Sequence, residues 1–284
     1  MPPTAAAFPL RAGSCLLAAL LCLPASHAAG PPPLPRWEWG LGLGAAHLRD
    51  YPGSSHSSTY ALPLPWFVWR SERAEVGREG GRGTLYRSRV QEIDFTLAAN
   101  PPSDIDDNPE RAGMEELDAV LEPGLRARWR FPLGSGWRFG IQLPVRYALT
   151  LDDRLRSAGL GLHAEPGISI DRNWMPGWNW SASLAAGFSE ADYTDYYYGV
   201  PAADATPVRP AYSAGGGYAG WQASTRIGWR RGDLTTGVFV RYEHVGDAVF
   251  RDSPLVTREH GVTTGLTLMW RLGQSRETVS RASP

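Results

Sequence analysis

Three arginines recur at every second position of one short segment, at Arg126, Arg128 and Arg130. Residues two apart in a β-strand point to the same face, so these guanidinium groups would share one side of a strand. The same alternation puts further charges on the corresponding face of other segments: Arg138, Arg146, Arg226, Glu92, Asp94, Glu122, Glu165 and Glu243. Such a face could be a hydrated interior of paired charges or a lining selective for anions, and the sequence leaves both open.

Metal and nucleophile chemistry have weaker signals. Oxygen-bearing residues crowd one loop, at Asp104, Asp106, Asp107, Asn108 and Glu110. They could attract Ca²⁺, but the glycine and terminal spacing of an EF-hand are missing, which favours a solvated acidic loop. The histidines after the first thirty residues are His47, His56, His163, His244 and His260, and none has zinc-like spacing. No local signature joins a serine to a histidine, so a hydrolase is not indicated, and a lipid-modifying enzyme has little support. We expect no metal, no cofactor and no enzyme activity.

The first 28 residues have the order of a secretory signal. Arg11 precedes an apolar run at residues 15–23, and Ser26-His27-Ala28 offers small residues for cleavage after Ala28. Both cysteines of the chain lie in this leader, so the sequence predicts no disulfide chemistry in the mature protein. The formal net charge of -1 gives no reason to expect nucleic acid as a partner.

A period of two dominates the rest of the chain. In residues 178–188 every second residue is apolar or aromatic, and small or polar residues stand between them. Residues 221–230 and 262–271 repeat the pattern, with aromatic side chains toward the ends. A tilted membrane-spanning strand needs about 9–11 residues and carries aromatic girdles at both interfaces. The sequence therefore predicts an all-β protein, an antiparallel transmembrane β-barrel over residues 29–272 that contacts outer-membrane lipid.

Eleven segments qualify as strands: residues 37–48, 60–70, 73–87, 90–99, 121–131, 137–147, 159–170, 178–188, 218–230, 234–244 and 261–272. Bacterial barrels have even strand numbers, so we predict twelve strands, with ten as the next choice. The weakest segment is 73–87, where glycines and charges blur the period. Pro63 and Pro65 cannot donate to a ladder, which predicts a bulge or interrupted pairing there. A soluble β-sandwich would also alternate, but its outward face would carry Lys, Glu and Thr.

Several segments resemble those of a known family. Residues 191–200 (ADYTDYYYGV) resemble its tyrosine-rich segment, and residues 253–256 (SPLV) resemble the loop before its last strand. Residues 41–45, 50–54 and 62–65 resemble its opening glycine strand, its Y-x-G-S loop and its second strand. The family is MipA/OmpV, the MltA-interacting proteins of Gram-negative outer membranes. Its members usually end on a Tyr-x-Phe strand, whereas this chain continues from Trp270 into a polar tail, expected to be disordered over residues 273–284.

The resemblance implies a scaffold in the cell outer membrane that bridges a lytic transglycosylase and a bifunctional murein synthase. A passive channel or porin with an arginine-rich lumen is the alternative. A scaffold needs contacts outside the wall, and tyrosine suits such contacts, so we expect partner binding at Tyr193, Tyr196, Tyr197 and Tyr198. The same rings could instead pack a loop against the barrel mouth. The residues expected to line the lumen are Arg126, Arg128, Arg138, Arg146, Arg226, Glu122 and Glu165. An open lumen would favour the channel, and a plugged, salt-bridged lumen would favour the scaffold.

Overall fold

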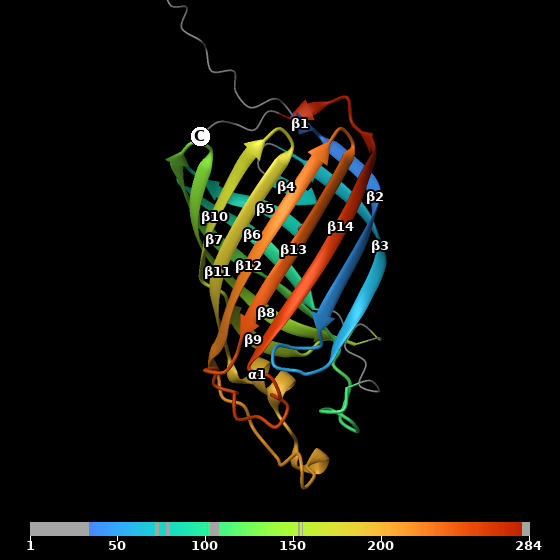
Figure 1. Ribbon diagram of the computed structural model, residues 1–284, viewed down its shortest axis with the longest axis vertical. Helices are drawn as coiled ribbons and strands as arrows, with labels where there is room; N and C mark the ends of the chain where they lie inside the picture. The colour runs from blue at the N-terminus through green and yellow to red at the C-terminus, as the bar shows by residue number, and fades with distance from the viewer. Residues whose placement is uncertain are drawn as a thin grey trace, which may run out of the picture. The chain divides into compact units, whose positions relative to one another are not determined.

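The computed structural model describes residues 34–71, 74–77, 80–100, 102, 108–152, 154 and 156–279. The expected signal segment, most of the acidic loop and residues 280–284 lie outside these ranges. The wall consists of β2 (Trp37–Arg49), β3 (Ser57–Arg70), β4 (Ala74–Gly77), β5 (Gly80–Arg87), β6 (Gln91–Asn100), β7 (Ala119–Gly134), β8 (Trp137–Leu151), β9 (Gly159–Ala164), β10 (Gly167–Met175), β11 (Trp178–Ser189), β12 (Gly217–Arg231), β13 (Leu234–His244) and β14 (His260–Gln274). The short pair β1 (Leu34–Pro35) and β15 (Thr278–Val279) forms a separate two-stranded sheet (Figure 1).

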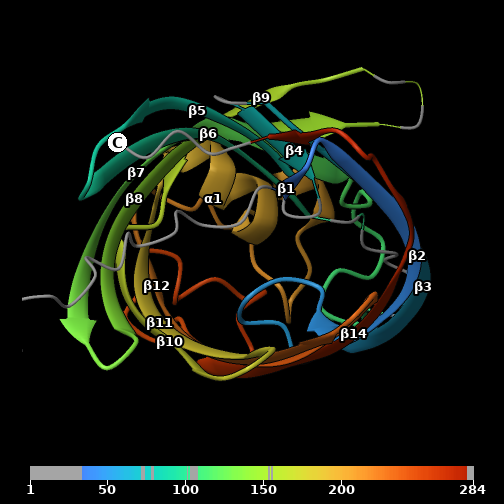
Figure 2. The same cartoon turned by 90° about the horizontal axis from the view of Figure 1, so that it is seen from above.

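All wall pairings are antiparallel, and they return to their starting point. The order runs from β2 through β8 and from β10 through β14, β14 pairs with β2, and β10 pairs with β8. β9 and β10 both pair with β8 and β11, so they form one long strand that bulges at Glu165 and Pro166. Counted in this way the closed sheet has twelve strands, as predicted, and the end-on view shows it as a ring (Figure 2).

Burial along the strands follows the predicted alternation. On β2 the exposed residues include Trp37 and Trp39, whose exposed fractions are 38% and 46%, while Glu38 between them is 4% exposed. The outer surface therefore consists of apolar side chains, and the inner surface consists of glycines, small polar residues and charges. This is the arrangement of a barrel whose wall faces lipid and whose lumen faces water.

The two prolines of β3 leave its pairing with β2 intact. Pro65 is opposite Leu41 and Pro63 is opposite Leu43, in a register without a bulge. Because proline has no N–H, both nitrogens must point away from β2, toward the side where β4 lies. On that side the described pairs involve only Trp69 and Arg70 of β3. The predicted interruption is therefore confirmed on one edge of the strand and absent from the other.

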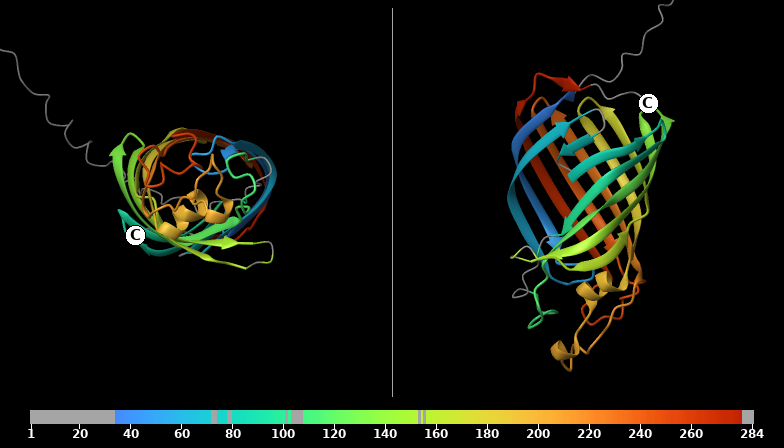
Figure 3. Two further views of the ribbon diagram at one scale, coloured as in Figure 1. Left: turned by 90° about the horizontal axis from the view of Figure 1, so that it is seen from below. Right: turned by 180° about the vertical axis from the view of Figure 1, so that it is seen from behind.

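The two ends of the barrel differ. Short turns join the strands at one end, as at residues 134–136 and 231–233, and we call it the turn end. At the other end, the loop end, lie the segments 190–216 and 245–259, which we call the plug. The plug contains α1 (Ala191–Tyr198) and the 3-10 helix η1 (Ala202–Asp204). In both end-on views α1 lies inside the ring (Figures 2 and 3). No described helix is long and apolar enough to cross a membrane.

The main hydrophobic core lies at the loop end. Its fully buried members come from the plug, from the neighbouring loops and from the inner wall: Tyr51, Leu117, Val120, Ala148, Leu160, Tyr197, Tyr198, Val200, Ala214, Val245, Ala248, Phe250 and Leu255. Tyr198 stacks on Phe250 with ring centroids 3.6 Å apart and planes 6° apart. The plug is thus held by packed aromatic rings and is an integral part of the fold.

The C-terminal end departs from the expected disorder. β14 continues to Gln274, and Thr278 and Val279 pair with β1. Arg36 donates a hydrogen bond from Nη1 to Glu277 Oε2 at 2.9 Å, which closes this clasp. The expectation of a disordered tail from residue 273 is therefore corrected for residues 273–279, because backbone pairing with the start of the chain orders them.

Candidate functional site

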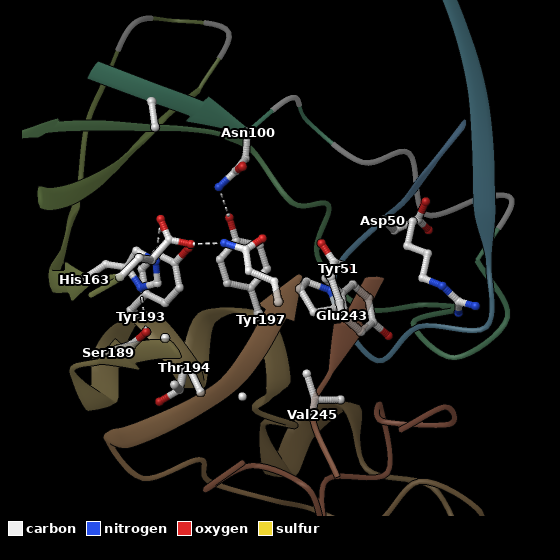
Figure 4. Close-up of a pocket in the computed structure, with 18 of the residues that line it drawn as sticks. Asp50, Tyr51, Asn100, His163, Ser189, Tyr193, Thr194, Tyr197, Glu243 and Val245 are labelled. Atoms are coloured by element: carbon white, nitrogen blue, oxygen red, sulfur yellow. Dashed lines mark hydrogen bonds and ion pairs between the residues drawn. The ribbon is translucent and has the colours of Figure 1, made fainter. Parts of the chain in front are cut away.

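A cavity of about 410 Å³ lies between the plug and the inner wall. Its lining combines aromatic rings of the plug with carboxylates, amides and a histidine from the strands (Figure 4). Most of the polar residues are positioned by strand alternation, since Asn100, Glu122 and Glu243 occupy inward positions of their strands, whereas Asp50 lies on a loop. The plug supplies the remaining wall through Tyr193, Thr194 and Tyr197.

Glu122 of β7 is the centre of the hydrogen-bond network, and it is 2% exposed. Its carboxylate accepts hydrogen bonds from Arg146 Nε at 2.9 Å, from Tyr193 Oη at 3.0 Å and from Asn100 Nδ2 at 3.2 Å. A buried carboxylate is stable only when such donors replace its water. Glu122 therefore links three wall strands to α1, and it fixes the plug to the barrel.

Arg146 of β8 joins this carboxylate to a second one. Its Nη2 donates to Glu165, which lies at the bulge between β9 and β10. Glu165 also accepts a hydrogen bond from Gln222 Nε2 of β12 at 2.7 Å. The two carboxylates share one buried guanidinium, whose five donors can satisfy both. The arrangement connects β7 and β8 to β12 through the bulge between β9 and β10.

Ser189 and His163 meet inside the lumen as direct cross-strand partners of β11 and β9. Ser189 Oγ lies 2.8 Å from His163 Nδ1, which is the distance required between a nucleophile and its base. The other ring nitrogen, Nε2, is 3.8 Å from Glu165, which is beyond hydrogen-bond reach. Both Glu165 oxygens already accept hydrogen bonds from other residues. The pair therefore lacks the third group that would orient the imidazole for acyl transfer, and strand alternation alone explains its contact.

The four tyrosines of the predicted partner site all belong to the plug. Tyr197 and Tyr198 are buried, with exposed fractions of 8% and 4%. Tyr193 stacks on His163 with centroids 4.8 Å apart. Burial and, next, the carboxylate of Glu122 raise the pKa of Tyr193 well above its usual range, so its hydroxyl remains a donor.

Tyr196 lies at the edge of the same cluster. Its hydroxyl donates to the Asp118 backbone oxygen at 3.5 Å, and burial followed by the Asp118 charge raises the pKa of Tyr196 to about 12. As folded, the tyrosines pack the plug onto the barrel mouth, which is the second of the two roles considered from the sequence. Their binding of a partner protein stays a prediction.

The turn-side half of the lumen holds most of the arginines. The Arg126 guanidinium forms a bidentate ion pair with the Asp94 carboxylate, with both N–O distances at 3.0 Å. Arg130 Nη1 lies 3.2 Å from Glu92 Oε2. Arg138 pairs with Asp171 of β10. The described residues include no carboxylate within ion-pair distance of Arg226. The interior is thus largely, but not completely, neutralised.

All seven residues that the sequence placed in the lumen lie on the inner face. Cross-strand registers put Arg128 opposite Glu92, and Arg226 opposite inward Ser181. Of the acidic loop, only Asn108 and Glu110 are described among its five oxygen-bearing residues. Both contact protein groups: Asn108 Nδ2 donates to Asp50 at 2.6 Å, and Glu110 Oε1 accepts from Thr257 Oγ1 at 2.7 Å. Among the described residues, no group of three His, Cys, Asp or Glu side chains could hold a metal ion.

Comparison with solved structures finds porins and channels of low sequence identity. Solved structures similar to this chain include the NanC porin, at 8% identity over 82% of this chain and all of that one, with a TM-score of 0.42. An outer membrane channel from Pseudomonas putida is 10% identical over 87% of this chain and 98% of that one, with a TM-score of 0.46. The CymD monoaromatic hydrocarbon channel is 12% identical over 85% and 90%, with a TM-score of 0.39.

A search of curated protein sequences finds no match. The model of one family matches residues 41–272, which is nearly the whole described barrel. This range includes the glycine strand, the tyrosine-rich segment and the loop before the last strand on which the resemblance was first noted. This chain is an outer-membrane β-barrel that belongs to the MltA-interacting protein MipA family.

Proposed function

We propose that this chain is an outer-membrane scaffold that holds enzymes of murein synthesis and remodelling at its turn end. The observation that carries the proposal is the ordered plug. Residues of the inner wall beneath it are almost completely buried, as for Val120 and Ala148 at 0% exposed and Glu122 at 2%. A lumen mouth filled by packed side chains suits a protein that presents surfaces better than one that conducts solutes. The name of the family supports the same class of partner, a murein hydrolase.

The orientation of the barrel decides which surface faces those partners. Outer-membrane barrels have short periplasmic turns and longer extracellular loops. By this rule the turn end faces the periplasm, where murein lies, and the plug faces outward. Tyr193, Tyr196, Tyr197 and Tyr198 lie at the outward end, so a murein enzyme would not reach them in the intact membrane. The proposal therefore assigns partner binding to the turn end.

Two apolar side chains mark the turn end. Leu133 precedes the turn between β7 and β8, and Met175 begins the turn between β10 and β11; they are 60% and 56% exposed. Because β8 pairs with β10, the two hairpins are neighbours in the wall. Exposed apolar residues on adjacent turns are the type of contact that a partner protein buries.

The test uses the purified full chain in detergent, with a soluble lytic transglycosylase and a bifunctional murein synthase as probes. The turn-end variant Leu133→Ser/Met175→Ser should bind the enzymes at least about tenfold more weakly, since each side chain loses buried apolar area. The control variant is Val208→Ser at the loop end, where Val208 is 91% exposed. It should bind as the wild type does. If the control loses binding and the turn-end variant keeps it, the proposed surface is wrong.

The passive channel is the second candidate, and the exposed arginines of the turn-side lumen are the observation that favours it. A channel would have to conduct past the plug. If the purified chain captures neither enzyme yet conducts ions in a planar bilayer, the scaffold proposal gives way to this alternative.

A further inference from the structure

Among the described side chains, the turn-side half of the lumen carries more positive than negative groups. The described side chains that point inward there, or lie at its rim, include the arginines Arg70, Arg87, Arg126, Arg128, Arg130, Arg138, Arg226, Arg230 and Arg271. The carboxylates in the same region are Glu38, Glu92, Asp94, Asp171 and Asp233. Among the side chains that the structure describes here, nine arginines therefore stand against five carboxylates. A low-dielectric wall focuses the field of such an excess into the lumen.

Two of these carboxylates, Glu38 and Asp94, form ion pairs with arginine side chains that are mostly buried. Glu38 binds Arg70 at 2.9 Å and Arg271 at 2.8 Å, and these guanidinium-bearing side chains are 11% and 19% exposed. Asp94 is likewise held by Arg126 and lies 3.8 Å from Arg128, whose side chains are 16% and 12% exposed. The buried arginines thus neutralise two of the carboxylates, and fewer carboxylates are left to pair with the arginines that are exposed to water.

The cations that remain accessible lie on β12 and on the wall beside it. Arg230 is half exposed and is 4.0 Å from Glu38, a carboxylate that already binds two closer arginines. Arg226 is exposed, and no described carboxylate pairs with it. Both side chains point inward from the same strand, and between them the Asn179 side chain of β11 covers Gly228.

Arg138 faces this pair from across two strands. The register runs from Arg138 to Asp171, then to Ser181, then to Arg226. Three strand spacings of about 4.8 Å separate the backbones of Arg138 and Arg226, roughly 14 Å in all. Two extended arginine side chains can reach toward each other over that distance. One solute carrying two or more oxyanion groups could contact both guanidinium groups at once.

We propose that the turn-side half of the lumen is a blind binding chamber for small polyanionic solutes. Arg226 and Arg230 provide the charge, Arg138, whose guanidinium also pairs with Asp171, provides a further contact, and the plug closes the outer end. The ligand class is a solute with several carboxylate or phosphate groups, because both are planar or tetrahedral oxyanions that guanidinium binds through paired hydrogen bonds. The chamber is distinct from the partner surface of the proposed function and does not depend on it.

Isothermal titration calorimetry on the purified full chain in detergent at low ionic strength tests this proposal. Citrate and pyrophosphate are the probes, and they distinguish a carboxylate from a phosphate source. Acetate and glucose are the matched weak and neutral probes. The wild type should bind at least one polyanion, with the affinity falling as salt rises, and should bind neither acetate nor glucose measurably.

Arg226→Gln should weaken the binding of that polyanion about tenfold, because one charge-assisted contact is lost while no described carboxylate loses its partner. Arg231→Gln is the matched control: it removes the same charge five positions further along β12, from a residue that alternation places on the outer face. It should leave the affinity unchanged, and both variants should keep the heat-modifiable migration of a folded barrel.

Three results would overturn the proposal. The first is no polyanion binding by the folded wild type up to about 10 mM, far above the dissociation constants of specific sites. The second is equal weakening by Arg226→Gln and Arg231→Gln, which would mean that only net charge matters. The third is steady anion current through the wild type in a planar bilayer, which would mean that the chamber is not blind.

Discussion

Replacing Ile227 with arginine tests the inward and outward faces of the wall most directly. Ile227 is on the outer face of β12, and its cross-strand neighbours are Trp180 and Val238. Its exposed fraction is 38%, which in the membrane means contact with lipid. The adjacent residue, Arg226, points into the lumen. The two positions therefore compare a lipid-facing and a water-facing site one residue apart.

The loss of stability expected for Ile227→Arg depends on how deep residue 227 lies in the bilayer. The aromatic residues Trp221 and Trp229 lie on the outer face of β12 and limit its apolar band, so Thr225 is at the middle. At about 3.3 Å per residue and a tilt of about 40°, Ile227 lies roughly 5 Å from the middle. Arginine costs about 2–4 kcal/mol at the midplane and about 0–1 kcal/mol near the interface, so we expect about 2 kcal/mol for Ile227→Arg.

The assay is reversible urea unfolding of the purified chain in lipid vesicles, followed by tryptophan fluorescence. A loss of about 2 kcal/mol changes the folding equilibrium constant about 30-fold. Arg226→Gln should change the free energy of unfolding by less than about 0.5 kcal/mol, since no described carboxylate depends on it. Equal losses for the two variants, or a larger loss for Arg226→Gln, would refute the facing of β12.

Three further predictions concern the ends of the chain and of the barrel. The exported protein should begin at Ala29 or Gly30, and N-terminal sequencing that finds Met1 intact would contradict this. Burial would raise the pKa of Glu110, but hydrogen bonds from two serines and a threonine outweigh it and lower the pKa below its usual 4.5. The ionised Glu110 side chain therefore contributes fully to loop stability above pH about 4.5, and this contribution is lost as the pH falls through its lowered pKa in the folded protein. Amide hydrogen exchange in the loops that contact Glu110 should accelerate on acidification of the wild type. The acceleration should be smaller in Glu110→Gln. Tyr198→Ala should destabilise the plug by about 3–5 kcal/mol and admit proteases there while the barrel stays folded, and unchanged proteolysis would argue against a packed plug.

Strand content and facing could be predicted from the sequence because alternation is a local property. In a barrel wall, every inward position must be small or polar and every outward position apolar, so the pattern repeats in each strand. The seven inward residues followed from this rule alone. The odd count of eleven was resolved at the weakest segment, where residues 73–87 contain two short strands, β4 and β5. Their glycines blurred the period that would have separated them.

The plug could not be predicted, because its structure depends on contacts distant in sequence. α1 has three consecutive tyrosines, which are modest helix formers, and Glu190 before it makes no capping hydrogen bond with its side chain. The helix is held instead by the burial of Tyr197 and Tyr198 against residues such as Phe250. For the same reason the sequence showed tyrosines available for contact, but not that the barrel mouth would receive them.

The clasp between β1 and β15 has a consequence for how the chain reaches the membrane. Arg36 and Glu277, which it joins, are separated by 241 positions, and the neighbouring seam pairs β2 with β14. β2 pairs with β3 along its other edge, but its pairing with β14 must wait until that last wall strand has left the cytoplasm. A sheet that lacks this seam has two unpaired edges, the form of a β-protein that is most prone to aggregate. We therefore expect a shortage of periplasmic holding chaperones to deplete this protein before it affects proteins with local pairing.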